Sequence, residues 1–279
     1  MLLQTLISAQ ALNEIIKQDN VILLDCRFYL TDHEKGRKEY EKEHIPKAIF
    51  VDVHHELAGV ETECSGRHPL PEAAVFADQL QHWGINQKSQ VVVYDDMSGA
   101  IAARAWWMLS QQGINVLVLD GGITAWREQG LPISTESADL LPSDHRFEVS
   151  FPWEVTENKI VENFELNLFQ LIDARSSDRF NGENETIDLV AGHIPGAINR
   201  PFSENLNAKG LFKTEDELKA GWGTLLSDNE EYVHYCGSGI TSCHNVLALN
   251  YAGIEAKRIY VGSWSQWSKR MLRAANVQV

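Results

Sequence analysis

VILLDCR (21–27) and FQLIDAR (169–175) decide the fold, because the second stretch repeats the pattern of the first in the other half of the chain. Four matched blocks in one order, about 140 residues apart, indicate a duplicated domain rather than a solenoid, whose units are much shorter. The three further pairs are HIPKAIFVD (44–52) with HIPGAINRP (193–201), VVVYDD (91–96) with YVHYCG (232–237), and LDGGITAW (119–126) with YVGSWSQW (260–267).

Within each half, short apolar runs alternate with helical patterns. Residues 21–25, 91–94 and 116–119 have the length and composition of buried strands, whereas 100–112 has helical periodicity. Ser8 is expected to cap the helix that follows it. The alternation predicts an α/β fold of two tandem domains, each with a parallel-sheet core flanked by helices.

The segment STESADLLPSDHRFEVS (134–150) is polar and has no helical period, which is typical of a linker. We therefore expect an N-terminal domain over residues 1–134, a linker over 135–150 and a C-terminal domain over 151–279. The first copy carries eight extra residues between the second and third repeated blocks.

Composition excludes several classes of protein. The 279 residues are 44% hydrophobic, and 24 basic against 39 acidic residues give a net charge of −15 and a pI near 5.1. This acidic balance argues against nucleic-acid and anionic-membrane partners. No stretch approaches the apolar length of a membrane span, and the N-terminus lacks the basic region of a signal peptide, so a cytoplasmic location is expected.

The four cysteines, Cys26, Cys64, Cys236 and Cys243, are not spaced as Cys-x-x-Cys or combined with histidines as a zinc site requires. In a reducing compartment they are expected to be free thiols. No metal site and no organic cofactor is expected.

One cysteine stands where a strand becomes a helix. The apolar run 232–235 leads into Cys236-Gly237-Ser238-Gly239-Ile240-Thr241, and a helical pattern follows from residue 242. Two glycines allow backbone N–H groups to curl around one point, and the helix N-terminus adds positive potential there. Such a cradle lowers the pKa of a thiol and produces a nucleophile at neutral pH.

The alternative for Cys236 is a small apolar residue that ends a core strand. The asymmetry of the repeat argues against it, because Asp95 occupies the matching position in the first half. One half has therefore kept a nucleophile and the other has not. Cys243, about one turn into the helix, is expected to be a core residue. His44 and His193 recur in both halves and are expected to be structural.

The repeated halves, the His-Ile-Pro blocks, the Cys-Gly-Ser-Gly-Ile-Thr loop and the segment GSWSQW (262–267) resemble tandem rhodanese-domain sulfurtransferases over essentially the whole chain. The resemblance implies a catalytically silent first domain, a cysteine in the second, and an active site between them. The loop is most similar to that of 3-mercaptopyruvate sulfurtransferases, which read Cys-Gly-Ser-Gly-Val-Thr. Thiosulfate sulfurtransferases typically place Arg and Lys after the cysteine.

The resemblance also implies roles for single residues. Arg179 matches a substrate-binding arginine, with a solvated loop arginine as the alternative. His68 matches a histidine directed toward the active site, against a turn histidine, and Ser238 matches a serine that assists proton transfer, against one that only orients the loop. The predicted site comprises Cys236 and Ser238 as catalytic residues, with Arg179, His68, Gly237, Gly239, Ile240 and Thr241 as substrate-binding residues.

One departure from the family weakens the assignment of the donor. Mercaptopyruvate enzymes often carry a second arginine after the first, but residues 181–191, NGENETIDLVA, contain neither Arg nor Lys. The acidic partner of the histidine is not clearly placed either, since the stretch before His68 offers Glu61 and Glu63.

The predicted activity is transfer of sulfur from 3-mercaptopyruvate, through a Cys236 persulfide, to a thiol such as thioredoxin or a small thiol, or to cyanide, with release of pyruvate. A thiosulfate sulfurtransferase is the alternative enzyme, and a sulfur-binding regulatory module is the alternative that is not an enzyme. A cysteine phosphatase is disfavoured, because it needs arginine at the sixth position after the cysteine, where this chain has Ser242.

Overall fold

The computed structural model describes residues 5–139, 141–226 and 231–275. The chain forms two compact units. The first contains the residues up to Gly59, Pro71–Pro152 and Asn207–Phe212. The second contains Val60–Leu70, Trp153–Leu206 and the residues from Lys213 onward. Each unit therefore includes one short segment from the other half of the sequence. The predicted linker over 135–150 stays a prediction.

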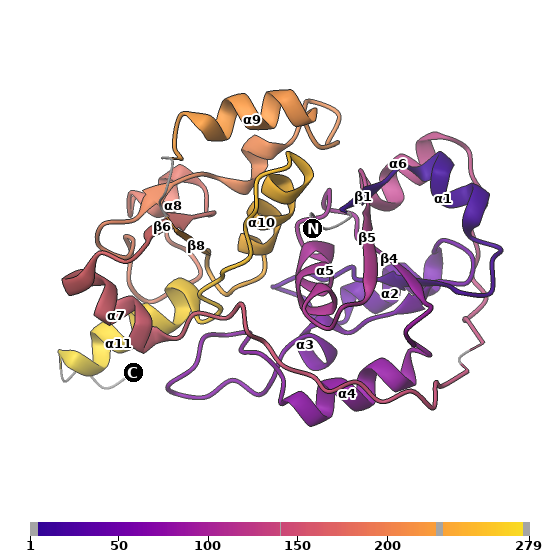
Figure 1. Cartoon of the computed structure of the whole chain (residues 1–279), viewed down its shortest axis with the longest axis horizontal. Coiled ribbons are helices and arrows are strands. Elements are labelled where there is room, and N and C mark those ends of the chain that lie inside the picture. The colour runs from indigo at the N-terminus through magenta and orange to yellow at the C-terminus, as the bar shows by residue number, and fades with distance from the viewer. Residues whose placement is uncertain (1–4, 140, 227–230, 276–279) are drawn as a thin grey trace. The chain divides into compact units, whose positions relative to one another are not determined.

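The first unit is built on a five-stranded parallel sheet with the strand order β1-β5-β4-β2-β3 (Figure 1). The repeated apolar runs form its central strands, and the helices between them cover it. Its elements are β1 (Leu6–Ile7), α1 (Ala9–Ile15), β2 (Val21–Asp25), α2 (Lys35–Lys42), β3 (Ile49–Phe50), α3 (Val53–Glu56), α4 (Ala73–His82), β4 (Gln90–Tyr94), α5 (Ala102–Ser110), β5 (Asn115–Leu119) and α6 (Gly122–Glu128).

The second unit repeats the β3-β2-β4 part of this sheet as three parallel strands in the order β7-β6-β8. Ile259 extends the sheet by isolated parallel bridges to His234 and Glu154. Its elements are α7 (Glu157–Leu166), β6 (Gln170–Asp173), α8 (Ser177–Phe180), β7 (Ile198–Asn199), the 3₁₀ helix η1 (Phe202–Asn205), α9 (Glu215–Gly223), β8 (Tyr232–Tyr235), α10 (Ser242–Tyr251) and α11 (Ser263–Ala274).

The repeated blocks fold alike at the ends of the central strands. In the first unit the buried carboxylate of Asp25 accepts hydrogen bonds from Arg27 Nη2 at 2.6 Å and from the Tyr94 hydroxyl at 2.7 Å. In the second, Asp173 accepts a hydrogen bond from Arg175 Nη2, also at 2.6 Å. Each pair is fully buried and satisfies its charges internally, which is the condition for keeping ionised groups in a core.

The repeated histidines are structural, as predicted. His44 stacks on Tyr40 with ring centres 3.9 Å apart, and its Nδ1 lies 2.7 Å from the Tyr40 carbonyl oxygen. His193 stacks on Phe180 at 3.8 Å, and its Nδ1 lies 2.9 Å from the Phe180 carbonyl oxygen. The same turn is therefore made twice, once in each unit.

The α/β fold class and its two parallel-sheet domains are confirmed. Ser8 caps α1, because its hydroxyl accepts the Ala11 N–H. Of the helices in the described ranges, none has the length and apolar character needed to span a bilayer.

Candidate active site

Cys236 lies at the carboxyl end of β8 with only 2% of its surface exposed. Its Sγ accepts the Gly239 N–H at 3.2 Å. Burial alone would raise the pKa of the thiol, but hydrogen bonds from Thr241 and from the N–H groups of Ser238 and Ser242 outweigh burial and lower the pKa. The loop therefore favours the thiolate, the reactive form of cysteine.

The two loop glycines are required for different reasons. Gly239 has a φ of +78°, and a methyl group on it would lie 2.4 Å from the Val261 carbonyl oxygen, so a side chain is excluded there. A methyl group on Gly237 would lie 3.2 Å from Arg67 Nη2 and 3.5 Å from Arg179 Nη1. Gly237 therefore leaves room for two guanidinium groups next to the nucleophile.

Ser238 and His68 meet although they are 170 positions apart in the sequence. Ser238 Oγ lies 2.9 Å from His68 Nδ1, and both side chains are buried. His68 belongs to the second unit through the segment Val60–Leu70, which we call the strap. Of the other predicted loop residues, Ile240 is buried at 5% exposure and Thr241 contributes to the lowered pKa of the thiol.

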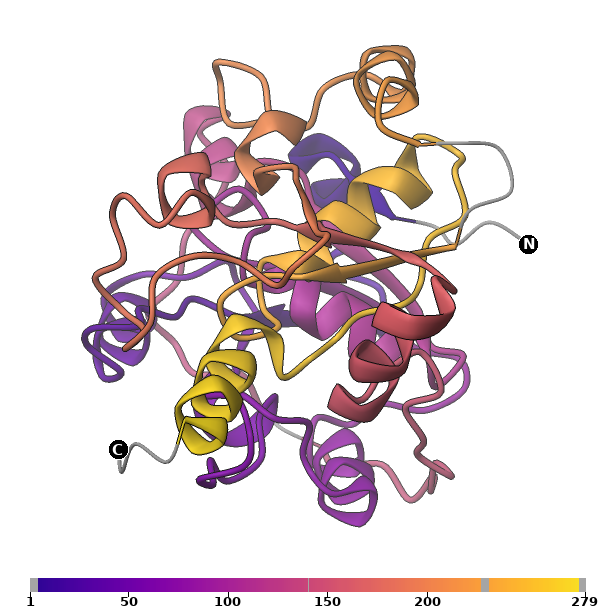
Figure 2. The same cartoon turned by 90° about the vertical axis from the view of Figure 1, so that its left-hand side faces the viewer.

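Helix α11 holds the strap through its polar face, and Figure 2 shows the strap as a purple segment beside this yellow helix. Its basic and amide side chains bind mainly carbonyl groups of the strap backbone, which fixes the path of the chain. The contacts run from Lys269 to the Glu61 carboxylate at 2.6 Å and to the Thr62 and Ser65 carbonyls, from Gln266 to the Cys64 carbonyl at 2.7 Å, and from Arg273 to the Glu63 carbonyl at 2.7 Å.

Arg179 lies on α8, and acidic residues of the following loop hold its guanidinium. Glu185 accepts from Arg179 Nε at 3.1 Å and from Nη2 at 2.9 Å, and Asp188 accepts from Nη2 at 3.1 Å. The opposite oxygen of Asp188 accepts from Arg67 Nη1. Arg179 is therefore a positioned side chain and not a solvated loop arginine, since only 18% of it is exposed.

Sequence reasoning missed two serines that support the site. The Ser263 hydroxyl accepts the Cys236 N–H at 3.1 Å and donates to the Tyr260 carbonyl at 2.9 Å. The Ser265 hydroxyl accepts the Arg67 N–H at 3.1 Å. The internal repeat could have revealed Ser263, because this serine stands where the first half has glycine in the matching block.

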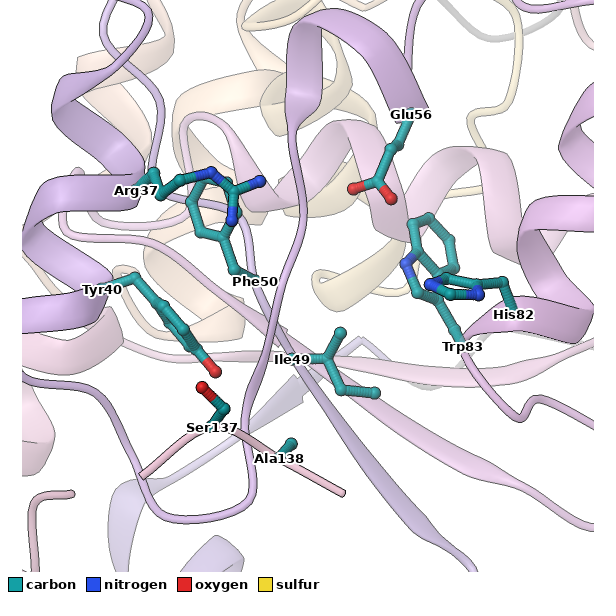
Figure 3. A pocket seen from close by; sticks show the side chains of 9 residues that line it. All are labelled: Arg37, Tyr40, Ile49, Phe50, Glu56, His82, Trp83, Ser137 and Ala138. Carbon is teal, nitrogen blue, oxygen red and sulfur yellow. The ribbon is translucent and has the colours of Figure 1, made fainter. Parts of the chain in front are cut away.

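A separate pocket of about 260 Å³ lies in the first unit. Burial raises the pKa of the Glu56 carboxyl to about 7, and Figure 3 shows this carboxyl on the same side of the pocket as Trp83. None of the predicted site residues lines it. The lining residues are Arg37, Tyr40, Ile49, Phe50, Glu56, His82, Trp83, Ser137 and Ala138.

The family model "Rhodanese-like domain" matches the chain twice, at residues 8–129 and 156–270. The chain belongs to the rhodanese-like sulfurtransferases. A probable 3-mercaptopyruvate sulfurtransferase of Pseudomonas aeruginosa is 42% identical to it, over 94% of each chain. A putative thiosulfate sulfurtransferase of Mycobacterium tuberculosis is 38% identical over 95% of this chain and 94% of that protein.

A solved structure shows the same likeness in three dimensions. The 3-mercaptopyruvate sulfurtransferase from Leishmania major superposes with a TM-score of 0.85 at 30% identity, covering 98% of this chain and 76% of that one. The enzyme class predicted from the sequence is confirmed, and this sulfurtransferase acts on a sulfur donor and a sulfur acceptor. The similar proteins carry the names of two different donors.

Proposed function

We propose that this sulfurtransferase moves sulfur from 3-mercaptopyruvate to a thiol acceptor through a persulfide on Cys236. The observation that carries the proposal is a buried thiol with a lowered pKa whose neighbour in the loop, Gly237, faces the Arg179 guanidinium. A thiolate supplies the electron pair, and an arginine suits the single carboxylate of the donor.

In the first half-reaction the Cys236 thiolate attacks the donor sulfur. The carbon–sulfur bond breaks, and its electron pair remains on carbon as the enolate of pyruvate. The proton lost from the donor thiol is returned to that carbon, so that pyruvate leaves and the persulfide anion stays on the enzyme. We assign the relay of this proton to Ser238, whose hydroxyl lies 2.9 Å from His68 Nδ1, and the stabilisation of the persulfide anion to the loop N–H groups.

In the second half-reaction the acceptor thiolate attacks the outer sulfur. The sulfur–sulfur bond breaks, the acceptor leaves as a persulfide, and the Cys236 thiolate is restored. Thioredoxin, a small thiol or cyanide would each supply a suitable nucleophile. We infer a reducing compartment such as the cytoplasm as the place of action, because the mechanism needs Cys236 as a thiolate that is not consumed by disulfide formation.

Thiosulfate is the alternative donor, favoured by the relatives that carry its name. The loop Gly237-Ser238-Gly239 has no cationic side chain of its own, whereas thiosulfate sulfurtransferases typically place Arg and Lys directly after the cysteine. The test is kcat/KM for both donors with one acceptor. Mercaptopyruvate should be the more efficient donor, and Arg179→Ala should lose efficiency mainly with it. Equal or higher efficiency with thiosulfate would remove the donor assignment.

A further inference from the structure

Arg67 is a second guanidinium beside the loop of Cys236, and it was not among the predicted site residues. It precedes His68 in the strap, and 19% of its side chain is exposed. We propose that Arg67 binds the anionic group of the sulfur donor together with Arg179. This inference rests on the sulfurtransferase function proposed above and adds a residue that determines which donors bind.

The atoms that face Gly237 support a shared role. Arg67 contacts a carboxylate through Nη1, and Arg179 does so through Nε and Nη2. A nitrogen that is not used in these carboxylate contacts lies nearest to Gly237 in each case. It is Nη2 of Arg67 and Nη1 of Arg179, measured to a methyl group placed on Gly237. Two hydrogen-bond donor groups from different segments of the chain therefore converge next to the nucleophile. A carboxylate has two oxygens and can accept one hydrogen bond from each.

Asp188 sets the spacing of this pair. One carboxylate oxygen binds Arg67 and the other binds Arg179, and only 4% of the Asp188 side chain is exposed. Because Asp188 lies between two cations, it holds both guanidiniums in place before the donor arrives. Such preorganisation reduces the entropy that the donor must lose on binding.

The charge of the site depends on Arg67. Ion pairs link the site residues into one continuous network in which acidic residues and arginines alternate. Three cations therefore balance three carboxylates. If Arg67 is removed, the carboxylates outnumber the arginines close to a thiolate, and an anionic donor is repelled. In order, the network contains Asp173, Arg175, Glu185, Arg179, Asp188 and Arg67.

Arg67 also supplies a second arginine, which the loop after Arg179 lacks. The loop over residues 181–191 has no basic residue, but the strap brings a cation from the other half of the sequence to Asp188 in that loop. The substrate class that fits is a small thiol-bearing 2-oxo acid, with one carboxylate for two guanidiniums.

Alkylation of Cys236 by iodoacetate and by iodoacetamide tests the anion site without any sulfur donor. The two reagents differ mainly in charge, so the ratio of their rates reports on cations near the thiolate. Arg67→Gln should lower this ratio about tenfold, the value of one charged hydrogen bond. Arg258→Gln is the matched control, because Arg258 pairs with Glu231 at the opposite end of β8 and should leave the ratio unchanged.

If the ratio of the two alkylation rates in Arg67→Gln lies within about twofold of the ratio in the unmodified protein, the inference is overturned. Arg67→Lys keeps the charge and should hold the ratio within about threefold, which guards against a folding defect in the glutamine variant. The double variant Arg67→Gln with Asp188→Asn restores the charge balance without restoring the guanidinium. It should remain impaired, and full recovery would mean that Arg67 acts only through net charge.

Steady-state kinetics then separate this inference from the proposed function. With mercaptopyruvate, Arg67→Gln should raise KM about tenfold and change kcat less than about threefold, since the lost contact is made by the bound donor as well as by the transition state. If the unmodified protein used only thiosulfate, the donor assignment would fail, while a changed alkylation ratio would still support Arg67 as an anion-binding residue.

Discussion

The loops that follow β4 and β8 occupy matching places in the two units, and in both of them backbone N–H groups surround an acidic side chain. After β4 the buried Asp95 carboxylate accepts four backbone N–H groups of its own loop at 2.8 Å each, from Met97, Gly99, Ile101 and Ala102. After β8 the loop N–H groups surround the sulfur of Cys236 instead. The duplicated loop is thus a cradle of N–H donors in both units, but burial raises the pKa of the Asp95 carboxyl, whereas the loop hydrogen bonds lower the pKa of the Cys236 thiol.

The starts of α6 and α11 differ in the same sense. Gly122 has a φ of +58°, and a methyl group on it would lie 2.1 Å from the Asp95 carbonyl oxygen. Ser263, in the matching position, adopts a φ of +54° although it carries a side chain. Its hydroxyl accepts the Cys236 N–H. The second unit accepts an unfavourable backbone conformation in order to support the residue that bears the sulfur.

The largest expected effect comes from removing the sulfur. Cys236→Ser should reduce sulfur transfer from every donor by at least about a thousandfold, because a hydroxyl cannot form the persulfide. Turnover measured with each donor, together with a circular dichroism spectrum like that of the unmodified protein, checks this. Substantial residual turnover would move the nucleophile to another residue.

The hydrogen-bonded carboxyl group of Asp95 in the first unit should matter for stability. Asp95→Ala leaves four N–H groups without their acceptor, and we expect the free energy of unfolding to fall by about 3 kcal/mol. Cys236→Ala should cost less, about 1 kcal/mol, since sulfur is a weaker hydrogen-bond acceptor than a carboxylate oxygen. Urea titration of both variants measures the difference. Equal losses of unfolding free energy would mean that the two loops depend equally on the side chain that they enclose.

Thr241 should affect the pH dependence of the reaction. Its hydrogen bond helps to lower the pKa of Cys236, so Thr241→Val should raise that pKa. The thiolate is lost as the pH falls through the pKa, and the variant should lose it at a higher pH. Below its pKa we expect a rate of persulfide formation about threefold to tenfold lower, with recovery at alkaline pH.

A matched control for this prediction is Thr224→Val, because the Thr224 hydroxyl donates to the Gly221 carbonyl at the end of α9. Its pH profile should coincide with that of the unmodified protein. A Thr241→Val profile that also coincides would show that the other loop hydrogen bonds suffice to lower the pKa.

The smallest effects are expected from the other cysteines. Burial, reinforced by the Asp25 carboxylate, raises the pKa of Cys26 well above that of Cys236, and Cys243 is buried in α10 as predicted. Cys64 is exposed in the strap. Alanine at each position should leave most of the turnover intact. A hundredfold loss in Cys243→Ala at unchanged thermal stability would instead indicate a resolving thiol.

Features encoded within short stretches were predictable from the sequence. The apolar runs and their repetition predicted the two parallel sheets, and the Gly-x-Gly turn after a strand predicted a cradle around Cys236. Local composition suffices for such features, because strand burial and turn geometry depend on neighbouring residues. The catalytic roles of Cys236 and Ser238 and the binding roles of the other site residues stay predictions.

Contacts between distant segments were not predictable. Arg67 reaches the loop of Cys236 only because α11, about 200 positions later, binds the strap backbone. The role of Asp188 depends on two arginines from different segments. Nothing in the local pattern of either residue specifies its partner, since long-range packing determines which side chains meet.

Intact-mass analysis after incubation with mercaptopyruvate and removal of excess donor shows whether Cys236 carries the transferred sulfur. We predict one added sulfur atom per chain, located on Cys236 by peptide mapping, lost on incubation with a thiol acceptor, and absent from the Cys236→Ser variant. An unmodified chain that nevertheless turns over the donor, or an added sulfur that persists in Cys236→Ser, would contradict it.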